Sequence, residues 1–532
     1  MVKMFRMGFA FFLALISAIS LGAVSTVSPA WAVDGWVQVG SDIDGEAAGD
    51  YSGKSVSLSS DGSRVAIGAP NNYGGADYAG HVRVYEWTGS AWAQLGSDIN
   101  GEAFDDLSGR SVSLSSDGSR VAIGAARNDG GGDSAGHVRV YSWTGSVWVQ
   151  MGSDIDGEAA GDYSAEEVSL SANGTRVAIG AQSNAGGGDY RGHVRVYDWN
   201  GSAWVQVGSD IDGEAQYDSS STSVSLSPDG STVAIGSRWN SGAGLMMSGH
   251  VRVYGLTGGA WAQLGSDIDG EASFDGSGAS VSLSSDGSRV AIGAVNNDGN
   301  GGNSGHVRVY GLTGGAWVQV GSDIDSAAAG DNSGYSVSLS SDGSRVAIGA
   351  NGNDGGGIDA GQVRVYDLTG GAWVQVGCDI NGEAAGDASG MPVSLTSGGS
   401  RVAIGAIAND GAGSLAGHVR VYDLTSSGGG CGGGGGGGGG AITSEPRNLT
   451  VSKKLTSERN LAWKAPKNLN GGSITDYIIQ YRVARTNLWS TFTDGISTNR
   501  RVKVTGLTKN VKYQFQVSAR TSGGDSPFSK AT

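Results

Sequence analysis

Cysteine and proline are scarce in this chain of 532 residues, which has two cysteines and seven prolines. Two cysteines cannot form the disulfide network that stabilises small secreted domains, so we expect packed cores to supply the stability. Cys378 stands where six similar segments carry serine, and Cys431 lies within a run of glycines. The length exceeds that of one ordinary domain.

Basic residues are few before residue 441. Residues 33–440 hold 18 basic against 46 acidic side chains, and their single lysine is Lys54. Residues 441–532 hold 15 basic against 5 acidic side chains. Such different compositions predict two domains, and the strongly acidic part argues against a nucleic-acid partner.

Long apolar runs are also rare, and the clearest one spans residues 8–24. It follows Lys3 and Arg6 and precedes the sequence AWA at 30–32, which is typical of a secretory signal peptide cut after residue 32. The alternative is an uncleaved membrane anchor, because 17 residues nearly span a bilayer. We expect cleavage, no membrane span afterwards, and a mature protein that is secreted or lies at the cell surface as a monomer.

Catalytic motifs are missing: the sequence has no nucleophile elbow, metalloprotease helix or phosphate-binding loop. All six histidines occupy one equivalent position of a repeat, and an arginine follows two residues later. We interpret both as packing residues of that repeat and expect no enzyme. The histidines are His81, His137, His193, His250, His306 and His418.

A repeat of about 56 residues dominates the chain. The segment SVSLSSDGSRVAIGA at 55–69 alternates apolar and polar residues on both sides of an Asp-Gly turn, which predicts a β-hairpin. It returns six times, and the segment HVRVY at 81–85 recurs at the same spacing. With a fourth strand at 92–96, each repeat supplies four strands (A to D), and this number predicts the blade of a β-propeller.

The two ends of the repeat array complement each other. Residues 36–40 read as a strand D without a preceding A, B or C, and the last repeat, 392–422, lacks its strand D. Strand 36–40 would therefore complete the last blade and remove the exposed ends of the array. We predict an all-β fold with a seven-bladed propeller at 33–425.

In a propeller of this kind, the links between successive strands lie on two opposite faces. The D–A and B–C links, such as 41–50 and 70–80, are long and emerge on one side, which we call the long-loop face. The A–B and C–D turns on the other side are tight. Because binding residues concentrate in such loops, the long-loop face is the expected binding face.

The residues Ile67-Gly68-Ala69-Pro70, followed by the pattern G-x-V-x-V-Y, resemble FG-GAP repeats over residues 33–425. The resemblance implies the seven-bladed head of integrin α-chains and of many bacterial surface proteins, and hence a role in adhesion. The Phe-Gly pair of that family is Ser52-Gly53 here, and its calcium-binding hairpin is shortened to Ser-Ser-Asp-Gly.

Acidic residues recur in the D–A loops. Carboxylates at alternating positions of a glycine-containing loop are ligands that calcium prefers. The alternative is that the side chains bond their own backbone as Asx turns. The candidate calcium ligands are Asp42, Asp44, Glu46 and Asp50.

One B–C loop differs from the others. In the fourth copy it is one residue longer and carries large apolar side chains in place of Asn, Asp and Gly. Exposed, they would form a contact patch; alternatively they pack on Phe274 or Tyr217. The candidate binding residues are Trp239, Leu245, Met246 and Met247.

A glycine-rich linker at 426–443 precedes a second domain at 444–532. Trp463, the Gly506-Leu507 pair and Tyr513 resemble the core tryptophan and tyrosine corner of fibronectin type III domains. Few residues follow Pro527, which predicts an incomplete last strand. The predicted strands are 449–451, 460–463, 477–483, 502–504 and 513–519.

Three functions remain open at this point. The first is a secreted or cell-surface adhesion protein that binds a protein or glycan through the long-loop face. The second is an extracellular carbohydrate-active enzyme, which should have carboxylates specific to one blade rather than repeated around the ring. The third is a purely structural surface protein without a ligand.

Overall fold

The computed structural model describes residues 35–185, 190–425, 446–452, 457–466, 474–484, 489–492, 498–521, 524–525, 529–530 and 532. The predicted signal peptide and linker lie outside these residues, as does Cys431. Within them, no helix is long and apolar enough to cross a membrane. Cys378 is disulfide-bonded.

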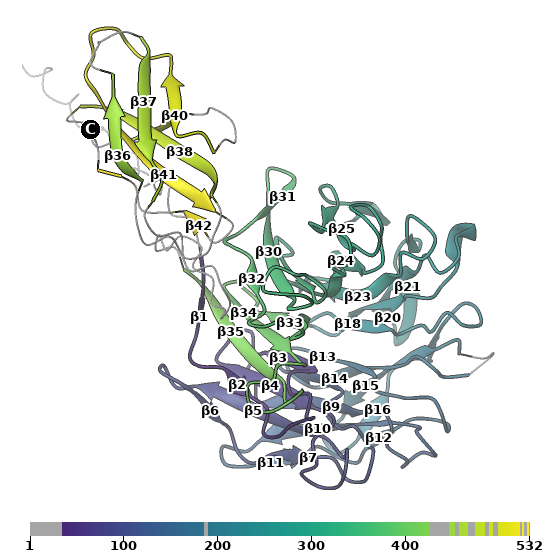
Figure 1. The fold of residues 1–532 in the computed structure, drawn as a ribbon. Coiled ribbons are helices and arrows are strands. Elements are labelled where there is room, and N and C mark those ends of the chain that lie inside the picture. The colour runs from purple at the N-terminus through teal and green to yellow at the C-terminus, as the bar shows by residue number, and fades with distance from the viewer. Residues whose placement is uncertain are drawn as a thin grey trace, which may run out of the picture.

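Residues 35–425 form seven antiparallel sheets, each with strands A to D and a two-residue fifth strand that pairs with strand C (Figure 1). Blade 1 is β3 (Ser55–Leu58), β4 (Arg64–Ala69), β5 (His81–Trp87), β6 (Trp92–Gln94) and β7 (Ile99–Asn100). Blade 2 is β8 (Ser111–Leu114), β9 (Arg120–Ala125), β10 (His137–Trp143), β11 (Trp148–Gln150) and β12 (Ile155–Asp156). Blade 3 is β13 (Glu167–Leu170), β14 (Arg176–Ala181), β15 (His193–Trp199), β16 (Trp204–Gln206) and β17 (Ile211–Asp212).

The remaining blades repeat this order. Blade 4 is β18 (Ser223–Leu226), β19 (Thr232–Ser237), β20 (His250–Thr257), β21 (Ala260–Gln263) and β22 (Ile268–Asp269), with the 3-10 turn η1 (Gly242–Gly244) between β19 and β20. Blade 5 is β23 (Ser277–Leu283), β24 (Arg289–Ala294), β25 (His306–Thr313), β26 (Ala316–Gln319) and β27 (Ile324–Asp325). Blade 6 is β28 (Ser333–Leu339), β29 (Arg345–Ala350), β30 (Gln362–Thr369), β31 (Ala372–Gln375) and β32 (Ile380–Asn381).

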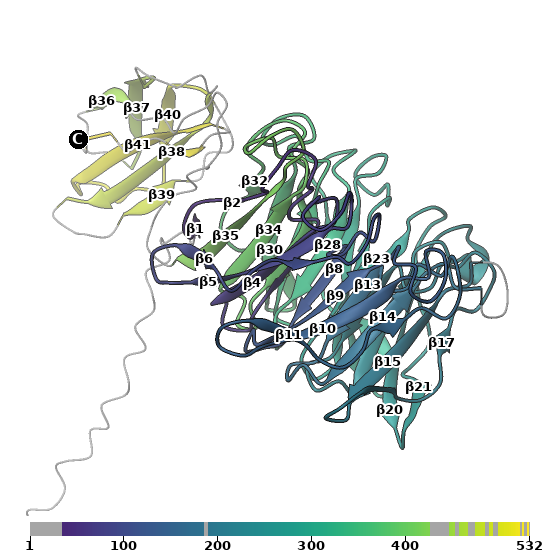
Figure 2. The same cartoon turned by 90° about the horizontal axis from the view of Figure 1, so that it is seen from below.

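Blade 7 joins the two ends of the array. It contains β33 (Ser389–Leu395), β34 (Arg401–Ala406) and β35 (His418–Thr425), together with β1 (Gly35–Gln38) and β2 (Ile43–Asp44) from the beginning of the chain. β1 lies beside β35 in both views (Figure 2), with Trp36 opposite Leu424. The outer strand of the last blade is therefore the N-terminal strand that the complementary ends predict.

The core lies between neighbouring blades. In the first such interface, Val82 and Ile99 of blade 1 pack with Leu114 and Ile123 of blade 2. Strand B is buried on both faces because blades cover both, and Gly68 permits the close approach. A Cβ there would lie 2.0 Å from the carbonyl oxygen of Gly109 in the next blade.

Strand A of every blade lines the central axis. The hydroxyl of Ser57 accepts a hydrogen bond from the Leu114 amide of the next blade, and Ser394 does the same for Leu58, which closes the ring. At the tight-turn end, the seven A strands surround a cavity of about 160 Å³. Its wall includes the equivalent leucines Leu58, Leu114, Leu170, Leu226, Leu283, Leu339 and Leu395.

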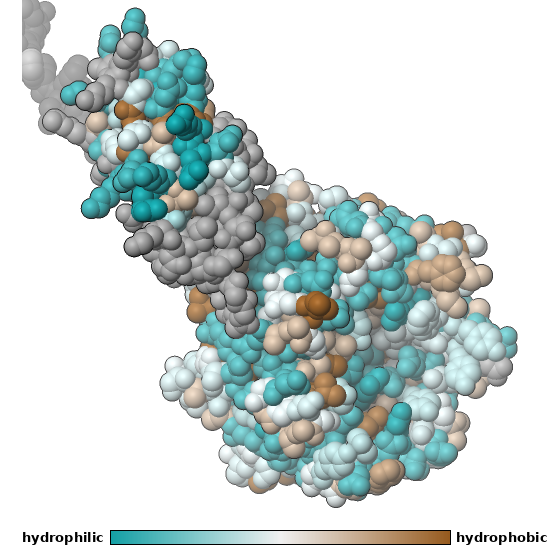
Figure 3. Space-filling view, viewed as in Figure 1, coloured by the Kyte–Doolittle hydropathy of each residue, from teal (hydrophilic) through white to brown (hydrophobic). Residues whose placement is uncertain are grey.

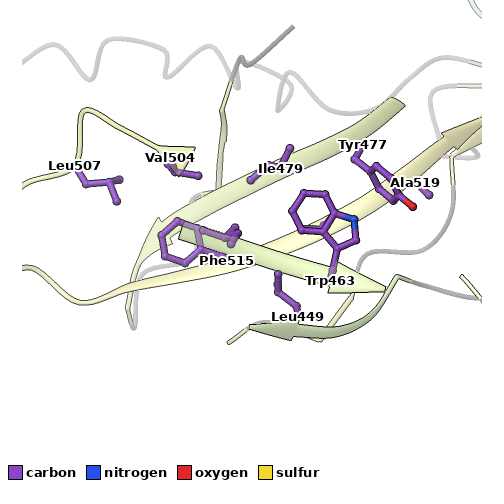
Figure 4. Close-up of a cluster of buried hydrophobic side chains, with 10 residues drawn as sticks. Leu449, Trp463, Tyr477, Ile479, Val504, Leu507, Phe515 and Ala519 are labelled. Carbon is purple, nitrogen blue, oxygen red and sulfur yellow. The ribbon is translucent and has the colours of Figure 1, made fainter. Parts of the chain in front are cut away.

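The C-terminal domain is a β-sandwich. One sheet contains β36 (Arg447–Val451), β37 (Arg459–Lys464) and β40 (Arg501–Val504); the other contains β38 (Ile474–Val483), β39 (Ser490–Phe492), β41 (Tyr513–Thr521) and β42 (Gly524–Asp525). Trp463 is buried in the core close to Tyr477 (Figure 4). The Tyr513 hydroxyl accepts a hydrogen bond from the Thr508 amide at 3.1 Å, as a tyrosine corner requires.

Candidate functional site

Departures from the seven-fold repeat gather on the long-loop face. Of the 18 basic residues in the propeller, 13 occupy two repeated positions, one at the start of strand B and one within strand C. The other five precede a strand A or lie in a B–C link, so all of them belong to the long-loop face. They are Lys54, Arg110, Arg127, Arg191 and Arg238.

Three of these basic residues meet acidic and aromatic side chains at the axis, and we call this group the axial cluster. Arg110 Nε lies 2.8 Å from Glu166 Oε2, although the two residues are 56 positions apart. Lys54 Nζ lies 3.9 Å from Met391 Sδ, across the closure of the ring. The members, which touch or act electrostatically on one another, are Lys54, Arg110, Glu166, Glu167, Arg238, Tyr335 and Met391.

Burial shifts the ionisation of the axial cluster. It raises the pKa of Glu167 to about 7, with help from the negative charge of Glu166, while Lys54 and Arg110 act in the opposite direction. Burial also lowers the pKa of Lys54 and of Arg238. The Nε of Arg238 is buried without a hydrogen-bond partner among the described residues. The axial cluster is therefore a polar site in which burial destabilises the charged forms of several side chains.

The fold does not require these residues. In five blades the serine equivalent to Ser55 donates its hydroxyl to a carbonyl oxygen of the next blade, as Ser55 does to Gly109. Glu167 replaces that serine in blade 3. Ala165 has a φ of 74° at a position where five copies carry glycine. Such departures from a repeat, made at the expense of local stability, are typical of functional sites.

The outlier loop of blade 4 is exposed. Trp239 is 40% exposed, and the Arg238 guanidinium lies 4.7 Å from the centre of its ring. Met246 and Met247 are also exposed, while Leu245 is half-buried. Their assignment as binding residues stays a prediction.

The neighbouring loops add aromatic side chains that the sequence alone suggested only as packing partners. Phe274 is 55% and Tyr217 60% exposed, and both have positive φ, at 71° and 67°. Four other copies have glycine here. The Phe274 amide donates to the Met246 carbonyl oxygen, and Tyr217 stacks on Tyr190. With Trp239 and Met247 these residues lie on successive loops of the long-loop face, from blade 3 to the link into blade 5, and we call them the aromatic sector.

The four candidate calcium ligands separate into different environments. Asp50 is buried, and its Oδ2 accepts hydrogen bonds from the Glu46 and Ala47 amides and from Asn72, as in an Asx turn. Asp42 and Asp44 lie near His418 of blade 7. Glu46 instead lies near His81 and Asp98 of blade 1. Calcium binding by these loops stays a prediction.

The repeated histidines are buried, and burial lowers the pKa of His81 and of His418 to about 4. The arginine that follows each histidine is buried as well. The Nη2 of Arg83 donates to the Asp44 carbonyl oxygen and so holds the D–A loop against strand C. This contact gives the arginine a structural role of the kind that its repetition predicts.

Comparisons with known proteins identify the second domain and give distant structural likenesses. Residues 444–532 match the family model of the fibronectin type III domain. A periplasmic gluconolactonase from Pseudomonas aeruginosa is 16% identical over 62% of this chain and 85% of its own, with a TM-score of 0.43. Module A71 of titin from human cardiac muscle is 26% identical over 17% of this chain and 86% of its own, with a TM-score of 0.16. The seven sheets of residues 35–425 and the family match at 444–532 define an all-β protein with a seven-bladed propeller followed by a fibronectin type III domain.

Proposed function

We propose that this protein is secreted and binds an extracellular protein or glycan, as a non-catalytic adhesion module, through the long-loop face of its propeller. The observation that supports the proposal is the concentration of residues that break the repeat on this face. The fibronectin type III domain and the resemblance of the repeats to FG-GAP surface proteins support the extracellular setting. Nothing in a seven-fold framework needs an exposed tryptophan or an aromatic residue with positive φ.

The aromatic sector supplies the contact area and the axial cluster supplies charge. Exposed aromatic residues with few rotatable bonds are the commonest anchors of binding surfaces. On the face of the propeller shown in Figure 3, hydrophobic residues occur singly or in small groups among hydrophilic ones. The aromatic sector adds several exposed rings on consecutive loops to such a surface.

The test is a screen of the mature chain against glycan and extracellular-protein arrays, repeated with Trp239→Ala. We expect the substitution to weaken binding about thirty-fold, since truncating an anchor costs about 2 kcal/mol or more. Val147→Ala is the control, because Val147 is exposed on a C–D turn of the opposite face. Equal loss of binding in both variants, or binding that Trp239→Ala leaves unchanged, would argue against the long-loop face.

Trp239→Ala should also leave the fold intact. The indole is 40% exposed and its ring contact with Arg238 contributes about 1 kcal/mol or less. Chemical denaturation should therefore show a small change in unfolding free energy. A loss of about 3–5 kcal/mol, typical of a buried tryptophan, would instead place Trp239 in the core.

The substitution Phe274→Gly is expected to change stability and binding affinity in opposite directions. Glycine adopts a φ of 71° without strain, so the variant should gain about 1 kcal/mol in unfolding free energy. If Phe274 belongs to the binding surface, affinity should fall at the same time. A variant that binds normally would remove Phe274 from the surface, and one that is destabilised would show that its ring packs on the loop of blade 4.

A carbohydrate-active enzyme is the second candidate, favoured by Glu166 and Glu167. These are acidic side chains that only one blade carries at this position, and one of them has a pKa raised to about 7. Incubating the mature chain with oligosaccharides and analysing the products by mass spectrometry tests this candidate. Turnover that disappears in both Glu166→Gln and Glu167→Gln would favour the enzyme over the adhesion module.

A further inference from the structure

Five of the six repeated histidines face two carboxylates from different loops. In the sixth, His306, Nδ1 lies 4.0 Å from Asp325 Oδ1. Burial lowers the pKa of His306, and the equivalent Glu271 and Asp323 are close enough to act in the opposite direction. Around His81, Glu46 belongs to the D–A loop before blade 1, and Asp98 to the D–A loop after it. The ligand atoms of these three residues lie within 4.8 Å of one another. The same set recurs in blades 2, 3 and 4 as Glu102, His137 and Asp154; Glu158, His193 and Asp210; and Glu214, His250 and Asp267.

Other side chains orient the carboxylates. Gln150 donates to Asp154 Oδ1 at 2.6 Å, and Asp154 Oδ2 then lies 3.8 Å from His137 Nδ1. In blade 1 the Arg83 guanidinium lies 3.6 Å from Glu46 Oε1, while Glu46 Oε2 lies 3.8 Å from His81 Nδ1. Each carboxylate thus uses one oxygen for an orienting partner and directs the other to the imidazole. Orienting contacts of this kind surround protein metal ligands.

The Nε2 atoms of all six imidazoles, and the Nδ1 atoms of His81, His137 and His250, are buried without a hydrogen-bond partner among the described residues. His81 is 1% exposed, and neither of its ring nitrogens has a hydrogen bond within the described part of the chain. A distance of 3.8 Å from Nδ1 to a carboxylate oxygen is too long for a hydrogen bond. Two ligands that lie about 2.1 Å from a tetrahedral ion are about 3.4 Å apart, so a small contraction of the observed spacing would bring both atoms onto one ion. A buried polar group left without a partner is costly, and an ion would remove that cost.

Blade 6 lacks both the histidine and the glutamate, which indicates that the two residues share one role. Gln362 replaces the histidine, and Ala327 replaces the glutamate in the same blade. Gln362 Nε2 donates to Asp379 Oδ2 and Asn381 Oδ1, at 3.2 and 2.8 Å. The amide therefore occupies the position in front of the aspartate. Independent packing residues would have no reason to be lost together.

We propose that six of the seven blades each bind one divalent transition-metal ion of the zinc type. The ligands are His Nδ1, one oxygen of the glutamate and one of the aspartate, with a fourth position open to water. A nitrogen ligand beside two carboxylates suits Zn²⁺ better than Ca²⁺, which takes oxygen ligands. Two carboxylates also outnumber the single nearby guanidinium, so each site has a negative charge that favours a cation.

Such an ion would connect two consecutive D–A loops to strand C. In blade 7 the site forms from His418, Glu383 and Asp42, and Asp42 comes from the beginning of the chain. Bound metal would therefore also hold the closure of the ring. It would fix the framework of the face on which the binding residues lie, whatever their ligand is.

The test is calorimetric titration of Zn²⁺ into the tag-free mature chain after removal of metals with a chelator. We expect six equivalents and a melting temperature that rises with Zn²⁺. The variant Glu46→Ala with His81→Gln copies blade 6, which shows that the fold accepts these residues, and it should bind five. The reverse change in blade 6, Ala327→Glu with Gln362→His, should bind seven.

A positioning variant completes the test. Gln150→Ala should weaken binding at one site about 10–100-fold, because losing an orienting partner typically has this effect on affinity. A titration with Ca²⁺ serves as the comparison. The proposal is overturned if Zn²⁺ does not bind, if the number of ions is the same in the two blade variants, or if Ca²⁺ binds at these sites more tightly than Zn²⁺.

Discussion

Removing residues 33–41 is expected to destabilise the propeller by at least about 3–5 kcal/mol and to cause self-association. The deletion removes β1 and with it Trp36, which packs on the core between blades 6 and 7 and donates from Nε1 to the Val376 carbonyl oxygen at 3.0 Å. It also leaves β35 as an unpaired edge, and such edges pair with other chains. Denaturant unfolding and light scattering at several concentrations measure the two effects.

Val37→Thr is the matched control for this deletion. Val37 lies in the same strand but is 53% exposed, so its substitution should change the unfolding free energy by less than about 0.5 kcal/mol. A deletion variant that is as stable and as monomeric as the parent would show that β1 is not needed to close the ring.

The sequence was sufficient to predict the architecture because the relevant signals are local and repeated. Alternation around an Asp-Gly turn predicts the A–B hairpin wherever it occurs, and a missing strand at each end predicts the pairing of β1 with β35. The two-residue strands were not predicted. Strand Ile43–Asp44, for example, lies in a segment that we expected to be a loop. A strand of two residues is too short to show an alternating sequence pattern.

The axial cluster could not be predicted from the sequence, for a different reason. Lys54 and Met391 are 337 positions apart and become neighbours only when the ring closes. The sequence did hold one indication of this cluster. The residue before strand A varies between copies, and in the first copy it is Lys54, the single lysine of an acidic domain. The exposed state of Phe274 depends on a backbone angle, and the sequence suggests it only through the glycines of other copies.

Replacing Glu167 with serine is expected to make the propeller more stable at pH 8 than the parent, by about 3 kcal/mol. The pKa of Glu167 is about 7 in the folded protein and near 4.5 when exposed. Between these values the folded state binds more protons than the unfolded state, so the parent loses stability as the pH rises from about 4.5 through 7. The serine variant lacks this loss, and its hydroxyl can donate to the next blade as Ser55 does.

Unfolding free energies of the parent and of Glu167→Ser, measured from pH 4.5 to pH 8, test this expectation. The difference between them should grow with pH and reach a plateau above pH 7. Glu167→Gln should remove the same pH dependence without adding the serine hydrogen bond. Asp133→Asn, in an exposed position of the long-loop face, should leave it unchanged. A constant difference between parent and serine variant across this range would mean that Glu167 ionises normally, and the axial cluster would then lose its strongest sign of a specialised site.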